Sequence, residues 1–518
     1  MARTDTPQPD DSARHGVLMR LPLSLLIWGI AAVSMWLPAI HALVRDRHQV
    51  SQSFFYAGLL GLICVALIAL SLGARRPRYG TLGQLLALFA SFTLLPLYLA
   101  LPLHDAMRTT SYLNAYFDMV SALTTTGANL FSDPARLDPS LHLWRAQVGW
   151  MGGLLMWVAA SAILAPLSLG GFEVTTQGQP GRASTAPAGH DRADSRKRLL
   201  RVTRTLAPVY AGLTAVVAVL LLMAGETPLV AVCHAMSVMA TSGISPVGGL
   251  AGAQSGLTGE AILFLFMFFA LSRLTFSSDT VGVGNARLDR DPEFRIGLAL
   301  VVGLPLLLFL RHWLAAYDVN TTENLNLALR ALWGAVFTVM SFLTTTGFES
   351  ADWEEARQWS GLGTPGLILM GLAVIGGGVA TTAGGVKLLR VYALYLNGLR
   401  DMQRLVHPSS VSGEAARNRR IQKDGAFIAW VFFMLFALSL SLVCVALSAL
   451  GASFDQAIVL AVAALSTTGP LIGIAADTPI QLVELSPAAK IVLCGAMVLG
   501  RLETLAIIAL FTPNLWRN

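Results

Sequence analysis

Four short strings of hydroxyl-bearing residues, each ending in glycine, recur along this chain of 518 residues. They are Thr124–Gly127, Ala240–Gly243, Thr344–Gly347 and Ser466–Gly469. Four glycine loops around one axis can form a ring of backbone carbonyls, which replaces the hydration shell of a monovalent cation. Glycine allows the backbone angles that turn successive carbonyls inward, and the neighbouring hydroxyl groups can stiffen each loop. The strings therefore predict a cation pore folded from a single chain.

The predicted filter consists of each glycine and the two residues before it. Its members are Thr125, Thr126, Gly127, Thr241, Ser242, Gly243, Thr345, Thr346, Gly347, Thr467, Thr468 and Gly469. One such string alone is more simply the end of a helix. Four of them, at a spacing of roughly 100 to 120 residues, indicate a domain-sized unit used four times.

A second pattern is a cluster of glycines within Ile375–Lys387, in the middle of a long apolar stretch. Each glycine costs about 1 kcal/mol against alanine inside a helix, so the helix should break here. A break at membrane depth must lie against protein or a water-filled cavity. The pattern favours a gate loop beneath the filter, and a packing face of small residues is the alternative. The predicted gate residues are Gly376, Gly377, Gly378, Thr381, Thr382, Gly384, Gly385 and Arg501.

Arg501 lies inside the last apolar segment of the chain. An arginine at the centre of a membrane helix costs about 2.5–3.5 kcal/mol on insertion scales, so its side chain should face protein or water. It can place a positive charge below the filter, or it can pair with Glu503 or another carboxylate. Arg273 lies nearer a membrane surface, where its side chain can extend to water, and His234 is expected to be a packed residue.

The composition places the chain in a membrane, because 54% of the residues are hydrophobic and only 13% are charged. Soluble proteins carry about 25% charged residues, and apolar runs of about 20 residues occur throughout this chain. The net charge of +6 comes from short loops and indicates topology rather than nucleic-acid binding. The four cysteines lie in apolar segments without metal-site or disulfide spacing.

The order of the apolar segments predicts an all-α polytopic membrane protein. Ten segments reach spanning length: 18–44, 53–73, 80–103, 143–169, 204–224, 258–277, 295–315, 363–400 (broken), 425–450 and 487–512. Four segments are too short or too polar to span and suit re-entrant pore helices: 111–123, 227–240, 326–343 and 454–466. Helix, pore helix, filter loop and helix thus repeat four times around one pore, after two extra transmembrane helices.

The predicted boundaries follow from this repeat. They are a disordered cytoplasmic tail (1–16), two leading helices (17–79), pore repeat one (80–170), a cytoplasmic loop (171–203), repeat two (204–292), repeat three with its broken helix (293–400), a second cytoplasmic loop (401–424) and repeat four (425–518). The basic connections Ala74–Tyr79, Gly181–Arg204, Asn285–Arg295 and Arg400–Lys423 all fall on one side. The positive-inside rule makes that side cytoplasmic, so the filter entrance faces outward.

With these motifs the chain resembles the Trk/Ktr/HKT superfamily of potassium transporters, and within it the bacterial TrkH type. Thr124–Gly127 and Thr344–Gly347 match the family filter, Gly376–Lys387 with Arg390 resembles the family's intramembrane loop, and Leu499–Glu503 followed by Phe511–Pro513 resembles its last helix. String two, with alanine first, and string four, Ser-Thr-Thr-Gly-Pro where an Asn-rich version is expected, depart from the pattern.

The resemblance implies potassium as the ion at the filter residues, because all four strings keep glycine. It also implies a homodimer in the bacterial inner membrane and a separate TrkA-like cytoplasmic RCK ring as regulator. No enzyme activity, no nucleic-acid partner and no cofactor beyond K⁺ are expected. The alternative function is a secondary carrier that couples another cation or small solute to an ion. An intramembrane enzyme is disfavoured, since the spanning segments offer neither paired aspartates nor a facing Ser–His pair.

Overall fold

The computed structural model describes residues 21–72, 81–131, 133–165, 191–272, 291–315, 325–361, 364–406, 416–476 and 480–503. Every regular element in these ranges is a helix, and the predicted all-α class is confirmed. Eight helices are long and apolar enough to cross a membrane: Leu23–Val44, His48–Leu72, Gly83–Ala106, Pro139–Leu164, Arg198–Met223, Pro292–Arg311, Asn326–Leu343 and Gly425–Ala449. The chain is therefore a multi-pass membrane protein.

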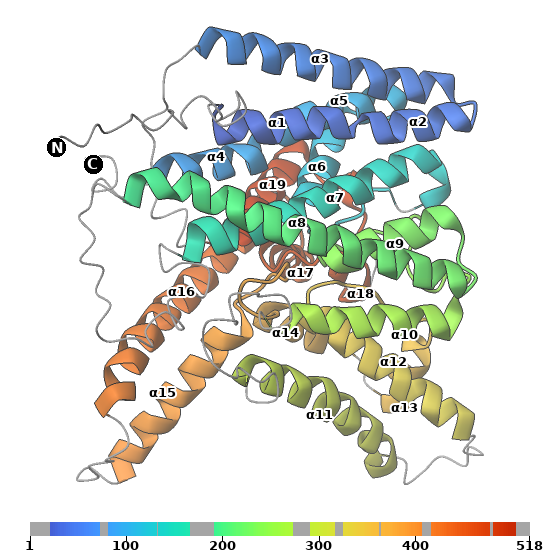
Figure 1. Ribbon diagram of the computed structural model, residues 1–518. Helices are drawn as coiled ribbons and strands as arrows, with labels where there is room; N and C mark the ends of the chain where they lie inside the picture. The colour runs from blue at the N-terminus through green and yellow to red at the C-terminus, as the bar shows by residue number, and fades with distance from the viewer. Residues whose placement is uncertain are drawn as a thin grey trace, which may run out of the picture.

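The leading helices form a layer at one edge of the molecule (Figure 1). Helix α1 (Leu23–Ser34) continues almost directly into α2 (Trp36–Val44), and α3 (His48–Leu72) folds back over both. The Tyr98 hydroxyl donates to the Ala57 carbonyl of α3 at 2.7 Å and ties this layer to the first repeat.

The four repeats follow in chain order. Repeat one holds α4 (Thr81–Thr93), α5 (Leu95–Ala106), α6 (Tyr112–Leu123) and α7 (Pro139–Ala159), which continues as a π turn to Leu164. Repeat two holds α8 (Asp191–Met223), α9 (Pro228–Ala240) and α10 (Gly256–Met267). Repeat three holds α11 (Pro292–Ala315), α12 (Leu325–Leu343), α13 (Trp353–Ser360), α14 (Gly366–Ile375) and α15 (Leu388–Val406). Repeat four holds α16 (Ala416–Ala449), α17 (Phe454–Leu465), α18 (Leu471–Ile474) and α19 (Pro487–Leu502).

The helices α6, α9, α12 and α17 are the predicted pore helices, and each ends directly before one of the glycine strings. Local sequence fixes where they begin. The Ser111 side chain accepts the Asn114 backbone N–H before α6, and Ser453 and Gln456 form a capping box at α17. Pro228 occupies the first turn of α9, where its missing N–H costs nothing.

Two predicted spans, 258–277 and 487–512, are too long where the structure describes them. Helix α12 has 19 residues and agrees with the predicted segment 326–343, but by length and composition it is also a candidate span, which the sequence did not predict. The predicted segment 363–400 is broken as expected, into α14 and α15. Helix α10 tightens into a 3₁₀ turn at Phe268–Ala270, α14 ends at Gly376 with φ +73°, and α19 ends at Glu503 with φ +63°. Left-handed backbone cannot continue an α-helix.

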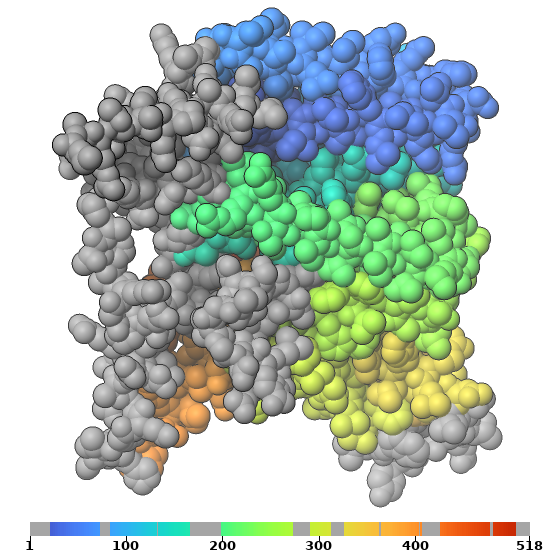
Figure 2. All heavy atoms as spheres, in the orientation of Figure 1, coloured from blue at the N-terminus to red at the C-terminus, as the bar shows by residue number. Residues whose placement is uncertain are grey.

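Helices α8, α15 and α16 lie at the outside of the pore repeats (Figure 1). Helix α8 lies across the face shown in Figure 2, directly beneath the leading helices. Helices α15 and α16 pack side by side and extend away from the rest of the bundle (Figure 1). Several predictions lie outside the described residues: the tail 1–16, the connection 74–79, most of the loop 171–203, residues 407–415 of the loop 401–424, Arg273 and Phe511–Pro513. The described parts of 401–424 are helical, because α15 runs on to Val406 and α16 already begins at Ala416.

Candidate ion pathway

The four strings share one unusual backbone conformation. The second residue of each string, Thr125, Thr241, Thr345 or Thr467, has a φ of +56°, +50°, +57° or +54°. A β-branched residue with positive φ is a rare conformation that costs of order 1–3 kcal/mol. Its presence at four equivalent positions shows that the strings are four copies of one loop. Threonine disfavours this conformation, so the sequence gives no signal for it.

Strings one, two and three contact one another in order. A Cβ atom placed on Gly127 would overlap the carbonyl oxygen of Ser242 in string two. A Cβ atom on Gly243 would overlap the carbonyl oxygen of Thr346 in string three. Any residue larger than glycine would therefore force neighbouring strings apart at these two positions.

String four closes the ring. A Cβ atom on Gly347 would lie 2.8 Å from Cγ of Pro470, which follows string four. The backbone N–H of Gly469 donates to the Thr126 carbonyl of string one at 2.6 Å. The loops that carry the predicted filter residues thus form one closed ring. Gly469 itself lies outside the left-handed region that Gly127, Gly243 and Gly347 adopt.

String four also departs from the others beyond its glycine. The chain turns at once into α18, and the Leu471 N–H donates to the Thr468 carbonyl at 3.2 Å. A Cβ atom on Gly243 would lie 2.6 Å from Cγ of Pro470, so the proline ring reaches string two across the ring. The Pro470 side chain and the bond to Thr126 make this quarter of the ring different from the other three.

Side-chain hydroxyls stiffen the strings, as their composition predicted. The first hydroxyls of strings one and three, Thr124 and Thr344, bond to a carbonyl of their own pore helix at 2.8 and 2.9 Å and to the hydroxyl two residues on. Ser466 makes the same bonds in string four. Ala240 has no hydroxyl, and string two instead places the Ser242 hydroxyl 3.2 Å from that of Ser237.

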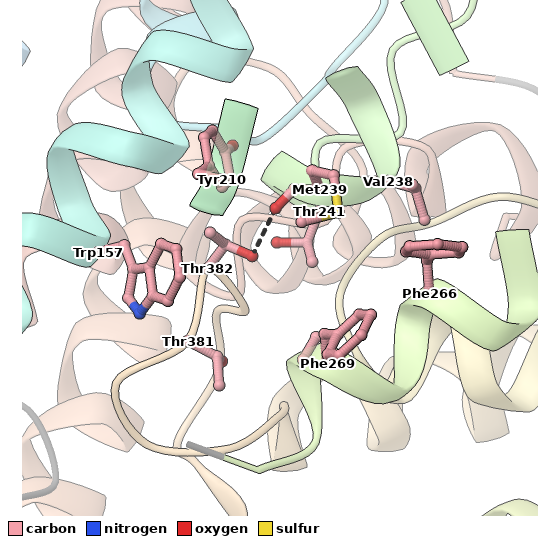
Figure 3. A pocket seen from close by; sticks show the side chains of 10 residues that line it. Trp157, Tyr210, Val238, Met239, Thr241, Phe266, Phe269, Thr381 and Thr382 are labelled. Atoms are coloured by element: carbon pink, nitrogen blue, oxygen red, sulfur yellow. Dashed lines mark hydrogen bonds between the residues drawn. The ribbon is translucent and has the colours of Figure 1, made fainter. Parts of the chain in front are cut away.

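The predicted helix break is confirmed: residues 376–387 join α14 to α15 without helical structure. This segment, called the Gly-rich loop below, is bonded to the strings and to the helices around them. The Gly384 N–H donates to Oγ1 of Thr345 at 2.7 Å. The Thr382 hydroxyl donates to the Met239 carbonyl at 3.1 Å, within an aromatic-lined pocket (Figure 3). The loop therefore lies directly against string three and against Met239, the residue before string two.

Glycine is needed in the loop for close approach as well as for breaking the helix. A Cβ atom on Gly384 would overlap the Ser466 carbonyl and the Thr467 hydroxyl of string four. A Cβ atom on Gly378 would overlap the Leu271 carbonyl. The alternative interpretation, a packing face of small residues, therefore explains part of the role of these glycines.

Arg501 reaches the Gly-rich loop from α19. Its side chain is 3% exposed, and its Nη1 donates to the Thr382 carbonyl at 2.7 Å. Its Nε and Nη2 have no hydrogen-bond partner among the described residues. The pair with Glu503 that the sequence left open is not formed, because Glu503 accepts from Nη2 of Arg390 at 2.6 Å instead. Arg501 and Glu503 line a cavity of about 20 Å³ together with Lys387.

On the other side of the ring, a cavity of about 330 Å³ is lined by all four string glycines. This cavity is called the outer vestibule below. The sequence did not single out Asp118 and Arg145, which form a buried ion pair at 2.9 Å beside it. It also did not single out Glu293, whose carboxylate accepts the Val379 N–H of the Gly-rich loop at 2.8 Å. Each of these is a charged residue in or beside an apolar stretch, and that was a signal for a buried charge. The sequence does not show which partner each charge contacts.

Comparison with known proteins decides which family has this arrangement. The profile of the family described as "TrkH: Cation transport protein" matches residues 294–518. The chain is 30% identical to the Trk system potassium uptake protein TrkH of Salmonella typhimurium over 490 residues, which cover 94% of this chain and 96% of that protein. The chain belongs to the TrkH family. Proteins of this family are cation transport proteins and not enzymes.

Two further relatives support the family assignment. TrkH of Halomonas elongata is 32% identical over 408 residues, which cover 78% of this chain and 80% of that protein. The crystal structure of the potassium transporter TrkH from Vibrio parahaemolyticus matches with a TM-score of 0.77 at 26% identity, and the match covers 96% of this chain and 99% of that one. The TrkH fold thus extends over nearly the whole chain.

Within this TrkH-family structure, the bond between Gly384 and Thr345 is a testable contact. Replacing Thr345 by valine keeps the β-branched shape and removes the hydroxyl that accepts the Gly384 N–H. A lost hydrogen bond of about 1 kcal/mol should loosen the loop and raise basal cation flux roughly fivefold. Tracer flux per folded protein in proteoliposomes measures this. Thr344→Val is the control, since the Thr344 hydroxyl bonds only within its own repeat; equal flux in both variants would contradict the prediction.

Proposed function

We propose that this chain takes up potassium through the ring of four strings. The observation that carries the proposal is the closed ring itself, in which four threonines, each two residues before a string glycine, adopt the same left-handed backbone. Carbonyl oxygens bind a dehydrated cation without adding net charge, so that the ion can also leave. Relatives over most of the chain's length are potassium uptake proteins of the Trk system, which supports K⁺ as the ion.

The pore helices supply a favourable field for a cation. All four end at the strings, and the carboxyl end of a helix carries a partial negative charge. The string residues Thr125, Thr126, Gly127, Thr241, Ser242, Gly243, Thr345, Thr346, Gly347, Thr467, Thr468 and Gly469 are the proposed ion-binding set. The Gly469 bond leaves the Thr126 carbonyl one lone pair for an ion.

The Gly-rich loop and Arg501 form the proposed gate on the cytoplasmic side of the strings. The loop lies directly against strings three and four, and Arg501 holds its Thr382 carbonyl. A cation that leaves the ring toward the cytoplasm meets this loop and a buried guanidinium. Displacing the loop and its arginine would open the path.

The wider setting is part of the same proposal. The protein acts in the bacterial inner membrane as a homodimer, each protomer with its own pore, and a separate TrkA-like cytoplasmic ring regulates it. K⁺ is the only bound ion or cofactor proposed.

Growth of a potassium-uptake-deficient bacterium at low external K⁺ tests the proposal. Expression of this chain should restore growth, and purified protein in liposomes should carry Rb⁺ down its gradient far faster than Na⁺. Flux that requires a second ion gradient would favour the alternative of a secondary carrier. No growth and no Rb⁺ flux, from a protein shown to be folded and inserted, would overturn potassium uptake.

A further inference from the structure

The outer vestibule contains two charged side chains among its lining residues, Arg145 and Glu349. The charge of Arg145 is already compensated. Its guanidinium lies 2.9 Å from the Asp118 carboxylate, it donates to the Asn129 amide oxygen at 3.1 Å, and both members of the ion pair are buried. Glu349 is therefore the one uncompensated charge among the described residues that line this cavity.

Glu349 has neither a hydrogen bond nor an ion pair within the described part of the chain, and it comes two residues after the string glycine Gly347. The chain on both sides of it is fixed. Phe348 is buried, with its ring 5.4 Å from the His234 ring. Ser350 donates to the Glu260 carboxylate at 2.7 Å, and the next residue, Ala351, donates its N–H to the same carboxylate at 2.6 Å.

We propose that Glu349 forms a recruiting site for a hydrated monovalent cation in the outer vestibule. This inference rests on the proposed function, because the cation would pass from this site into the ring. A fixed carboxylate in a concave, partly desolvated cavity concentrates cations locally. Since the carboxylate is a side chain in the vestibule and not part of the ring, it sets how well dilute cations are captured rather than which cation passes.

The other carboxylates near the vestibule are already engaged: Asp118 with Arg145, Asp352 with Arg330, and Glu260 with Ser350 and Trp333. Among these described carboxylates, Glu349 is therefore the one that remains open to a cation.

Glu349→Gln tests the site, because it removes the charge and keeps the size of the side chain. In a low-salt medium at pH 8, the external K⁺ concentration for half-maximal uptake should rise about three- to tenfold, with the maximal rate little changed. High ionic strength should reduce the difference.

Glu354→Gln is the matched control. Glu354 lies five residues further along the chain, is more than half exposed and pairs with Arg357, so its variant should take up K⁺ with nearly the wild-type half-saturation. A folded Glu349→Gln variant with unchanged half-saturation at low salt would overturn the site. If the wild type itself failed to take up K⁺, the proposed function would fail instead, so the two failures are distinguishable.

Discussion

Replacing Gly127 by serine is expected to reduce the preference for K⁺ over Na⁺ by at least about tenfold. The new Cβ atom would overlap the Ser242 carbonyl oxygen, and the residue would keep a φ of +68°. Left-handed backbone costs a non-glycine residue roughly 1–2 kcal/mol, and the overlap must be relieved by moving string one or string two. A shift of 1.4 kcal/mol in the relative barriers for two ions already changes their flux ratio tenfold. Rb⁺ and Na⁺ flux in the same vesicles measures that ratio.

Gly361→Ser separates the two causes. Gly361 has nearly the same backbone, with φ +60°, but nothing lies within 4 Å of a Cβ atom placed there. This control should lose a little stability and keep its ion preference. If Gly127→Ser were folded and kept the wild-type flux ratio, string one would not be part of the selective path.

The parts of this fold that depend on local sequence could be predicted. Apolar length and charge content gave the membrane class, and the four pore helices end where the glycine strings begin. The glycines at 376–378 broke the third repeat's helix as expected, because helical glycine is costly wherever it lies. The bounds of α12 were also predicted to within one residue, although its length and composition make it a candidate span and not only a half-length pore helix.

The parts that depend on contacts between distant segments could not be predicted. Arg390 and Glu503 are far apart in the chain, and only the tertiary fold brings the start of α15 to the residue that follows α19. The left-handed threonines run against their own preference and are held by the surrounding ring. Pro470 was visible in the sequence, but its reach across the ring to Gly243 depends on how string four turns into α18.

The two buried arginines near the Gly-rich loop differ in how far their charge is compensated, which the sequence left open. Arg390 is fully buried, pairs with Glu503 at 2.6 Å and lies 3.7 Å over the Phe432 ring. Arg501 has a single hydrogen bond, to the Thr382 carbonyl, and two guanidinium nitrogens without a partner among the described residues. The first arrangement satisfies a buried charge, as expected for a structural residue. The second leaves positive charge unbalanced beside the loop, as expected for a barrier.

Arg501→Ala is therefore expected to increase cation flux by one to two orders of magnitude. Repulsion between two unit charges at about 5 Å is about 3 kcal/mol at an effective dielectric of about 20, and each 1.4 kcal/mol is a factor of ten in rate. The change also frees the Thr382 carbonyl, which Arg501 holds at 2.7 Å. It leaves no buried carboxylate without a partner, because Glu503 remains paired with Arg390, so the melting temperature should change little.

Arg390→Ala is the control. It leaves Glu503 buried without its partner, which should cost about 3–5 kcal/mol of unfolding free energy and lower the melting temperature. Flux per folded protein and melting temperature, measured on both variants, separate the roles. An Arg501→Ala protein that is destabilised like Arg390→Ala, with unaltered flux per molecule, would show that Arg501 is structural and that the loop closes the path without its charge.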